Sequence, residues 1–321
     1  MQNTTSYNKR LNINELNNTA NLEEPIKNAE HLYISNLLGD EELLSSINFY
    51  LKKYNKKLWL SLDESTEMNQ ENLKQLRYLT NVKKLKIIVF NGFIEDLSEL
   101  SHIDDLEEFT IYNNVKKGIS LVPLAKFKNL SFLSLYTGLT IKQYTVLNTF
   151  EKLEHLSARE IDFSKLNNLP IKELTVDSKF IHSDLIAEKF PDIEYISLQN
   201  CKDVSIENIG SLPVLSDVRL RYMPHITRLT SFKNKENIFH LECVHLKNLE
   251  NIEALFELKQ LKYLMITDLE KLKAEDFYRL KELPNLKVAY ITFKNAKEND
   301  KFITFANAHN WIYKQPSLVG G

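Results

Sequence analysis

Apolar and polar residues alternate in a short segment that returns along most of this chain. In Ile193–Cys201 the apolar residues stand at positions 193, 196, 198 and 201. Such alternation predicts a half-buried β-strand, because successive side chains of a strand point to opposite faces. One period later the matching positions are Leu215, Val218, Leu220 and Met223. The recurrence, more than any one strand, is the evidence for a repeated fold.

The repeat keeps one frame over eleven predicted strands. In each strand a second apolar residue follows the first inward residue by two positions, and from the second strand onward another precedes it by three. Successive first inward residues are 18 to 25 positions apart. A period of about 20–29 residues with this spacing indicates stacked structural repeats. The first inward residues are Leu60, Leu85, Phe109, Leu133, Leu156, Leu174, Ile196, Val218, Leu241, Leu264 and Ala289.

The spacing resembles the leucine-rich repeat, as in Leu130-x-x-Leu133-x-Leu135 and Leu261-x-x-Leu264-x-Ile266. The resemblance covers residues 29–295 and implies an α/β solenoid, a horseshoe with a parallel concave sheet and a helical or irregular convex side. Many family members carry Asn five positions after the first inward residue, whereas only Asn114 does so in this chain. We therefore predict a bacterial-type variant without the Asn ladder, in which apolar stacking joins neighbouring repeats.

The array is expected to lie between two caps. Residues 1–56 are predicted to form an N-terminal cap with a first repeat-like strand, Ala29–Ile34, and a helix that begins after Asp40. An Asp side chain suits this N-cap position, because its oxygen can accept a hydrogen bond from a backbone N–H of the first turn. Residues 57–295 form the predicted repeat array, and residues 296–321 form a C-terminal cap and tail.

The segments between strands predict short helices or turns on the convex side. Helical spacing appears in Asn69–Leu79 and Ala274–Leu283, and Asp300–Trp311 is predicted as a capping helix. The shortest repeat leaves only residues 162–170 for its return, enough for about one turn of helix. Proline disfavours helix at the residue before it, so three prolines predict helix ends before strands. They are Pro191, Pro213 and Pro284.

The composition and charge of the chain indicate which classes of partner its surface can bind. The chain has 321 residues, 43% of them hydrophobic and 26% charged, with 41 basic and 43 acidic residues. This balance predicts no binding to nucleic acid or to an anionic membrane surface. Residues 1–12 contain no apolar signal segment, and no apolar run approaches the roughly 18–20 residues of a membrane span. With its abundant Lys, Asn, Ile and Leu, the chain is expected to be bacterial and cytoplasmic.

The cysteines and histidines predict no metal site and no cofactor. Cys201 and Cys243 lie two repeats apart at different positions of the frame, so we expect two buried free thiols. The frame places Cys243 inward and His240 outward, so that the two cannot share a metal ion.

Candidate nucleophiles are equally sparse. The chain has no Gly-x-Ser-x-Gly motif and no phosphate-binding glycine loop. His155, Ser157 and Glu173 could form a triad across adjacent strands, but they would stand on an open sheet that does not exclude water. We therefore predict a protein without enzymatic activity and name no catalytic residue.

The residues that alternate with the inward positions are expected to line the concave face. Aromatic residues and arginines gather there, and these types dominate the energetics of protein interfaces. Two other interpretations remain open: the aromatic residues stiffen the sheet, and the interleaved acidic residues form ion pairs with the arginines. The predicted partner-binding residues are Tyr112, Phe132, Tyr136, Arg159, Tyr195, Arg219, Arg221 and Tyr263.

The predicted function is that of a solenoid which binds a protein partner on its concave face, with no membrane span. Within this class the chain could be a toxin-neutralising immunity protein or a regulatory protein. Two further alternatives are the targeting module of a bacterial effector enzyme and a glycan-binding module that uses the aromatic residues. The sequence identifies neither the partner nor the oligomeric state.

Overall fold

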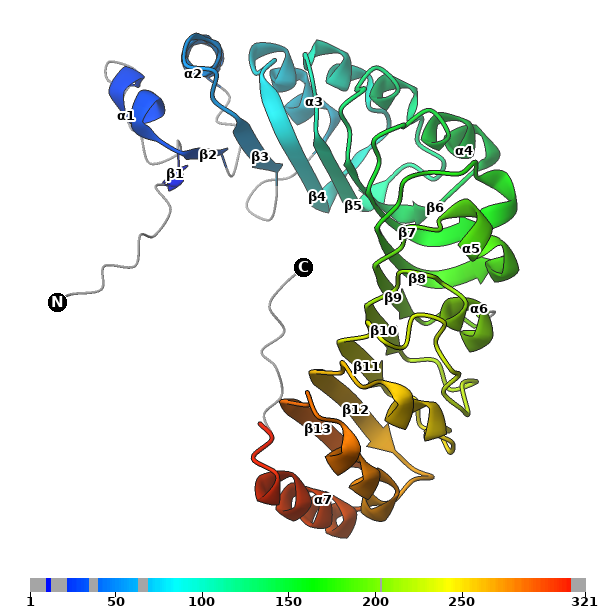
Figure 1. The fold of residues 1–321 in the computed structure, drawn as a ribbon. Coiled ribbons are helices and arrows are strands. Elements are labelled where there is room, and N and C mark those ends of the chain that lie inside the picture. The colour runs from blue at the N-terminus through cyan, green and yellow to red at the C-terminus, as the bar shows by residue number, and fades with distance from the viewer. Residues whose placement is uncertain (1–9, 13–21, 35–39, 63–68, 203, 313–321) are drawn as a thin grey trace, which may run out of the picture. The chain divides into compact units, whose positions relative to one another are not determined.

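The chain forms two compact units, Met1–Ala158 and Arg159–Gly321. In each unit the strands follow one another in the order of the chain and pair in parallel, with helices on one face of the strands (Figure 1). The computed structural model describes residues 10–12, 22–34, 40–62, 69–202 and 204–312. The boundaries given above between the two caps and the repeat array remain predictions.

The strands of the first unit keep the predicted frame. Leu60, Leu85, Phe109 and Leu133 are register partners from one strand to the next, and each is almost fully buried. The row of first inward residues therefore forms a continuous apolar core. The described strands are β1 Arg10–Asn12, β2 His31–Ile34, β3 Leu58–Leu62, β4 Val82–Ile94, β5 Glu108–Val115 and β6 Phe132–Gly138, while β7 His155–Asp162 contains the point of division.

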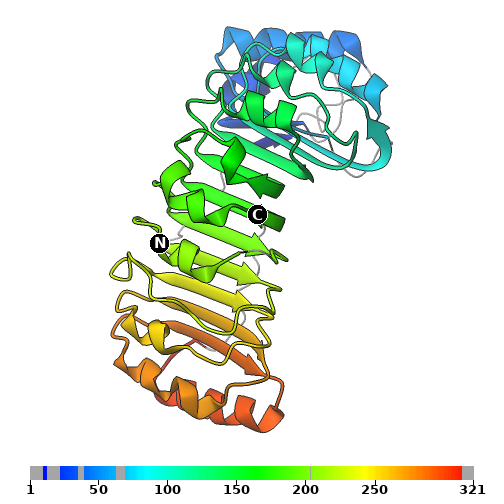
Figure 2. The same cartoon turned by 90° about the vertical axis from the view of Figure 1, so that its right-hand side faces the viewer.

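The second unit continues the same pattern, with its strands side by side from green to orange in Figure 2. The register joins the first inward residues from Leu174 to Ala289 in one row. All of them have no exposed surface, which confirms the frame. The strands are β8 Glu173–Ile181, β9 Tyr195–Gln199, β10 Asp217–Arg221, β11 His240–Val244, β12 Tyr263–Leu269 and β13 Val288–Phe293.

Apolar stacking replaces the Asn ladder, as predicted. The residues five positions after the first inward residue in β9 to β12 are Cys201, Met223, Leu246 and Leu269, and all four are buried. Asn114 keeps the polar arrangement, since its side-chain amide donates to the carbonyl oxygen of Phe90 at 3.1 Å. Each repeat therefore covers its inner surface mainly by apolar contact with its neighbours.

The connecting segments contain short helices. As predicted, Asp40 caps the first long helix, because its carboxylate accepts from the backbone N–H of Leu43 at 2.9 Å. Proline also acts as expected: the helix before Pro191 ends at Lys189. No helix among the described residues is long and apolar enough to cross a membrane. The α-helices are α1 Glu23–Asn28, α2 Glu41–Lys53, α3 Gln70–Leu73, α4 Ile141–Leu147, α5 Ile186–Lys189, α6 Ile206–Gly210 and α7 Ala296–Ala308.

Several returns are tighter than an α-helix. The segment Ala274–Glu282 is a 3₁₀ helix, and the predicted helix Asn69–Leu79 is divided between α3 and the 3₁₀ turn Lys74–Tyr78. A 3₁₀ helix rises about 2.0 Å per residue against 1.5 Å for an α-helix, so it spans the same distance with fewer residues. Helical spacing in the sequence does not distinguish the two forms.

The shortest return contains the three-residue 3₁₀ turn Phe163–Lys165, in line with its predicted length. Three fully buried aromatic rings fill the space beneath it. Phe163 meets Phe180 and Phe190 edge to face, with ring centroids 4.9 and 5.4 Å apart. These bulky side chains replace the apolar contacts that a longer helix would make.

Near both ends of the described chain, single elements differ from the predicted ones. The sequence placed the first repeat-like strand at Ala29–Ile34, whereas an earlier strand, β1, pairs with β2. At the other end α7 begins at Ala296, before the predicted Asp300, because the side chain of Asn295 accepts from the N–H of Lys297. Phe302, Ala306 and Trp311 of this segment are buried, and Phe305 is partly exposed.

Candidate functional site

Helices cover one face of the strands, and we call the other face the open face (Figure 1). Because successive side chains of a strand point to opposite faces, those that alternate with the buried rows lie on the open face. In the first unit this face carries three of the predicted partner-binding residues, all aromatic and partly exposed. The hydroxyls of Tyr112 and Ser134 are hydrogen-bonded at 2.9 Å, and the rings of Tyr112 and Tyr136 are 5.5 Å apart. Phe132 stacks on His155 at 4.0 Å. The stack therefore joins the open faces of β6 and β7.

In the second unit two of the predicted partner-binding residues, Tyr195 and Arg219, contact each other. The Arg219 guanidinium lies 4.9 Å from the centre of the Tyr195 ring. Its Nε and Nη2 donate to the two carboxylate oxygens of Asp217 at 3.2 Å. His240 approaches the same carboxylate, with Nδ1 at 3.2 Å from Oδ2. The arginine is therefore held between an aromatic ring and a buried acid.

The environment of Asp217 stabilises its charged form. Burial raises the pKa of this carboxyl, but hydrogen bonds from His240 and Arg219 lower it by more, so that the pKa lies below its ordinary value. The open face thus contains a buried negative charge that its own neighbours compensate.

Arg221 has a similar internal partner, because its Nε donates to the carboxylate of buried Glu242. The ion pairs left open by the sequence therefore exist for both Arg219 and Arg221. Tyr263 is different: it lies 5.9 Å from the ring of His240 and is 43% exposed. Arg159 of β7 is also exposed.

A row of left-handed residues follows the strands of the second unit. Each stands four positions after the first inward residue; the first three lie directly after β9, β10 and β11, and the fourth lies within β12. Positive φ is uncommon for residues other than glycine and is most frequent for Asn, Asp and His. The residues of this row are Asn200, Tyr222, His245 and Asp268, with φ values of 56°, 55°, 54° and 61°.

The backbone of this row is tied to the next strand. The N–H groups of Asn200 and Tyr222 donate to the carbonyl oxygens of Arg221 and Val244 at 3.0 and 2.9 Å. In the next two repeats a threonine hydroxyl replaces the carbonyl group as the acceptor. The hydroxyl of Thr267 accepts from the N–H of His245 at 3.4 Å, and that of Thr292 accepts from Asp268 at 3.1 Å.

The side chains of the row also contact one another. Tyr222 and His245 stack with their rings 4.6 Å apart and 18° from parallel. Nδ1 of His245 lies 2.9 Å from Oδ2 of Asp268, and the hydroxyl of Thr267 donates to the same oxygen at 2.8 Å. One connected arrangement therefore joins three consecutive repeats.

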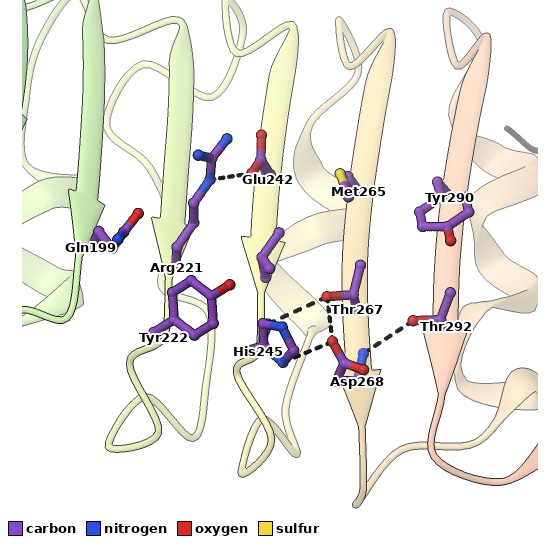
Figure 3. Close-up of a pocket in the computed structure, with 11 residues that line it drawn as sticks. Gln199, Arg221, Tyr222, Glu242, His245, Met265, Thr267, Asp268, Tyr290 and Thr292 are labelled. Carbon is purple, nitrogen blue, oxygen red and sulfur yellow. Dashed lines mark hydrogen bonds and ion pairs between the residues drawn. The ribbon is translucent and has the colours of Figure 1, made fainter. Parts of the chain in front are cut away.

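This arrangement borders a hollow of about 390 Å³ on the open face of β9 to β13. Figure 3 shows its lining, with the stacked Tyr222 and His245 beside Asp268 and the threonines, and Arg221 beside Glu242. The lining residues are Gln199, Arg221, Tyr222, Glu242, Val244, His245, Met265, Thr267, Asp268, Tyr290 and Thr292.

Sequence reasoning identified only Arg221 among the residues that define this hollow, and it missed Tyr222, His245 and Asp268. A faint signal exists, because Asn113, Asn200 and Asp268 share one frame position and are residue types that tolerate positive φ. Tyr at this position has no such preference, so the sequence did not indicate that Tyr222 would leave the strand.

The described residues were compared with the predictions for metal ligands and for the two cysteines. Among them no group of three or more His, Cys, Asp or Glu side chains could hold a metal ion. Cys201 and Cys243 are free and buried, as predicted, and burial raises the pKa of the Cys243 thiol. Neither thiol is therefore placed to act as a nucleophile.

Comparison with known proteins found leucine-rich-repeat structures with low sequence identity to this chain. No family model matches the chain, and no curated protein matches it significantly. A leucine-rich-repeat protein of Leptospira interrogans has 15% identity and a TM-score of 0.42, over 91% of each chain. An internalin of Listeria monocytogenes, inlF, has 14% identity and a TM-score of 0.41, over 91% of this chain and 82% of its own. Internalin C2 of the same organism has 17% identity and a TM-score of 0.33, over 78% and 84%.

The fold itself rests on the chain's own features. Strands recur in one frame, pair in parallel in the order of the chain and bury one apolar row, while short helices cover one face. These features give both units the fold of a leucine-rich-repeat-like solenoid.

Proposed function

We propose that this chain is a non-enzymatic scaffold that binds another protein through its open face. The observation that supports the proposal most strongly is the contrast in the second unit between compensated charges and projecting tyrosines. The charges of Arg219 and Arg221 are compensated by acidic neighbours. Tyr222 and Tyr263, in contrast, are 46% and 43% exposed. Partly exposed tyrosines on a rigid support are typical of residues that a partner buries at an interface.

Rigidity supports the same function. Immobilising a flexible side chain on binding costs about 0.5–1.5 kcal/mol. Stacking on His245 orders Tyr222, and the hydrogen-bonded row holds the backbone on both sides of it. A partner would therefore meet side chains that are already ordered, so more of the interaction energy would appear as affinity.

The first unit offers a second set of contacts. We propose that Tyr112, Phe132 and Tyr136 bind the partner through their exposed ring surfaces. Each aromatic ring already packs against another side chain, which again reduces the ordering that binding requires.

The test begins with capture of a partner from an extract of the source organism and its identification by mass spectrometry. The affinity of the purified partner is then measured for the variants Tyr263→Ala and Tyr222→Gly, for the double variant that combines them, and for the control Tyr278→Ala. Tyr278 is 38% exposed but belongs to a connecting 3₁₀ helix. We expect the double variant of Tyr222 and Tyr263 to lose about tenfold or more in affinity, or about 1.4 kcal/mol. Unchanged affinity in that double variant would refute binding at this face of the second unit.

Glycine is the appropriate replacement for Tyr222. A left-handed backbone costs an L-residue roughly 1–2 kcal/mol, and glycine removes this cost while losing more conformational entropy on folding. Loss of the ring also removes a stack worth about 0.5–1.5 kcal/mol. These effects oppose one another, so the variant should keep nearly the stability of the parent while its binding surface is lost.

A further inference from the structure

The end of β4 contains a bulge, because several residues there face a single residue of β5. Val89 pairs with Asn113 and Ile94 with Val115, so residues 90–93 stand opposite Asn114 alone. Such an insertion bends a strand and turns side chains out of the regular pattern, and bulges are frequent beside functional sites. All the inserted residues are exposed, whereas Ile94, where pairing resumes, is fully buried. The inserted residues are Phe90, Asn91, Gly92 and Phe93.

We propose that Asn91 in this bulge is a site of spontaneous covalent modification, at which the side-chain amide is converted to a carboxylate by the neighbouring backbone and water. Asn91 and Gly92 form the only Asn-Gly dipeptide of the sequence. The inference goes beyond the proposed binding function and does not depend on it, because the reaction needs no partner.

The first step closes a ring within the chain. The backbone nitrogen of Gly92 attacks Cγ of Asn91 and forms a new C–N bond. The bond from Cγ to the amide nitrogen breaks, and that nitrogen takes up the proton lost from Gly92 and leaves as ammonia. The product is a cyclic succinimide.

The second step opens the ring with water. Attack of water at Cγ breaks its bond to the Gly92 nitrogen and gives aspartate. Attack at the main-chain carbonyl carbon of Asn91 breaks the other bond to the same nitrogen and gives isoaspartate, in which the chain continues through Cγ. No oxidant, reductant or metal ion takes part in either step.

The bulge meets the requirements of the first step. Glycine has no Cβ that would crowd the attacking nitrogen. The Asn91 side chain is exposed, and no described residue forms a hydrogen bond with its amide. Because residues 90–93 have no individual register partners in β5, the backbone at Asn91 is freer to turn towards ring closure than that of a paired strand.

The same glycine is needed for the shape of the bulge. Gly92 has a φ of 96°, in a region that residues with a Cβ rarely adopt. The conformation that projects this segment from the sheet therefore places after Asn91 the residue type that least hinders the attack.

Two other exposed asparagines lack part of this arrangement. Asn113 lies directly across from the start of the bulge, but it is followed by Asn114, whose side chain hinders approach of the backbone nitrogen. Asn200 uses its amide to donate to Asp177 at 2.9 Å, which holds the amide in place. Asn91 is therefore expected to react faster than either.

The product would change the surface of the first unit. A carboxylate would replace a neutral amide between Phe90 and Phe93, which are 48% and 47% exposed. Isoaspartate would also lengthen the main chain by one methylene group at the bulge. A patch of exposed apolar side chains would thus gain a negative charge.

The test incubates the full chain in mildly alkaline buffer made with heavy-oxygen water, at physiological temperature. After quenching in acid and proteolysis, mass spectrometry measures each asparagine peptide, and electron-transfer fragmentation distinguishes isoaspartate from aspartate. We expect Asn91 to react at least about tenfold faster than Asn113, or about 1.4 kcal/mol in activation free energy. Both isomers should carry one heavy-oxygen atom. A smaller ratio, an unmodified Asn91, or aspartate without isoaspartate would overturn the inference.

The unfolded chain separates the dipeptide from its structural setting. In concentrated urea the ring closes without any constraint from the bulge. We expect the native chain to react at a rate within about tenfold of the unfolded chain, a difference of less than about 1.4 kcal/mol. A larger difference would show that the bulge protects Asn91, and the inference would then be wrong.

Two variants assign the change of charge to this residue. Ion-exchange chromatography of the incubated parent should show a growing acidic species that elutes close to Asn91→Asp. Asn91→Gln keeps an amide, but its additional methylene group requires a larger and less favourable ring, so this variant should not accumulate the species. Accumulation in Asn91→Gln at the rate of the parent would place the reaction elsewhere and refute the assignment.

Discussion

Phe163 provides the strongest test of how the shortest repeat is stabilised. The ring is fully buried and meets Phe180 and Phe190 edge to face. Phe163→Ala would leave a cavity bordered by both partner rings. The turn Phe163–Lys165 has only three residues with which to close that cavity, so little relaxation is expected.

The magnitude follows from the buried area. A buried phenylalanine covers about 150–250 Å². At about 25 cal/mol per Å², most of this area corresponds to about 3–4 kcal/mol. The unfilled cavity and the lost aromatic pairs act in the same direction. We therefore expect a loss of about 3–5 kcal/mol in the free energy of unfolding, in line with other Phe→Ala replacements in protein cores.

The two tryptophans make the assay specific for one unit. Trp59 lies in the first unit, and Trp311 is 8% exposed in the second. In a Trp59→Phe background, urea denaturation followed by tryptophan fluorescence reports on the unit that contains Phe163. A loss below about 1 kcal/mol would refute the idea that this ring supports the short return.

Two controls define what the ring contributes. Phe163→Leu keeps much of the volume and should cost about 1–1.5 kcal/mol. Phe239→Ala removes a ring that is 37% exposed in the same unit and should cost less than about 1 kcal/mol. If all three variants lost the same free energy, the effect would not depend on burial of the ring.

Three further outcomes are expected. Gly210→Ala should lower the free energy of unfolding in urea by about 1–3 kcal/mol, because its Cβ would lie 2.9 Å from the carbonyl oxygen of Ser231; an unchanged value would show that the backbone can move. The folded-state pKa of Asp217 lies below its ordinary value of 3.8, so the stability from its charge is present above that pH and is lost as the pH falls through the folded-state value. Asp217→Asn should therefore be less stable than the parent at neutral pH in chemical denaturation, with the difference shrinking in acid, whereas a constant difference would contradict this assignment. Cys201 and Cys243 should react with a maleimide, detected by mass spectrometry, only after unfolding, since both are buried; rapid labelling of the native chain would contradict their burial.

Local periodicity was sufficient to predict the fold. Every strand must place alternate residues in the core, and every repeat must cover its neighbour, so the apolar positions recur in the sequence itself. This is why the frame from Leu60 to Ala289 coincides with the register and the burial of the strands. Cap and turn chemistry is also local, and Asp40 was identified as an N-cap for that reason.

The candidate site could be predicted only in part. Alternation places Tyr195, Arg219 and Tyr263 on the open face. It cannot tell which arginine meets an acid, because that choice depends on side chains from strands more than twenty positions away. The ion pairs of Arg219 and Arg221 were therefore an open alternative until both carboxylates were located.

Tyr222 is the clearest example of a residue whose conformation the sequence did not predict. Its residue type favours a strand, yet its φ of 55° takes it out of β10. A backbone hydrogen bond to Val244 and a ring stack with His245, both in the next repeat, hold it there. The sequence by itself determined the repeat, the buried rows and the face on which polar side chains stand, because these follow from a local alternation. The hollow and its partners were decided by the tertiary structure, since they depend on which residues of successive repeats become neighbours.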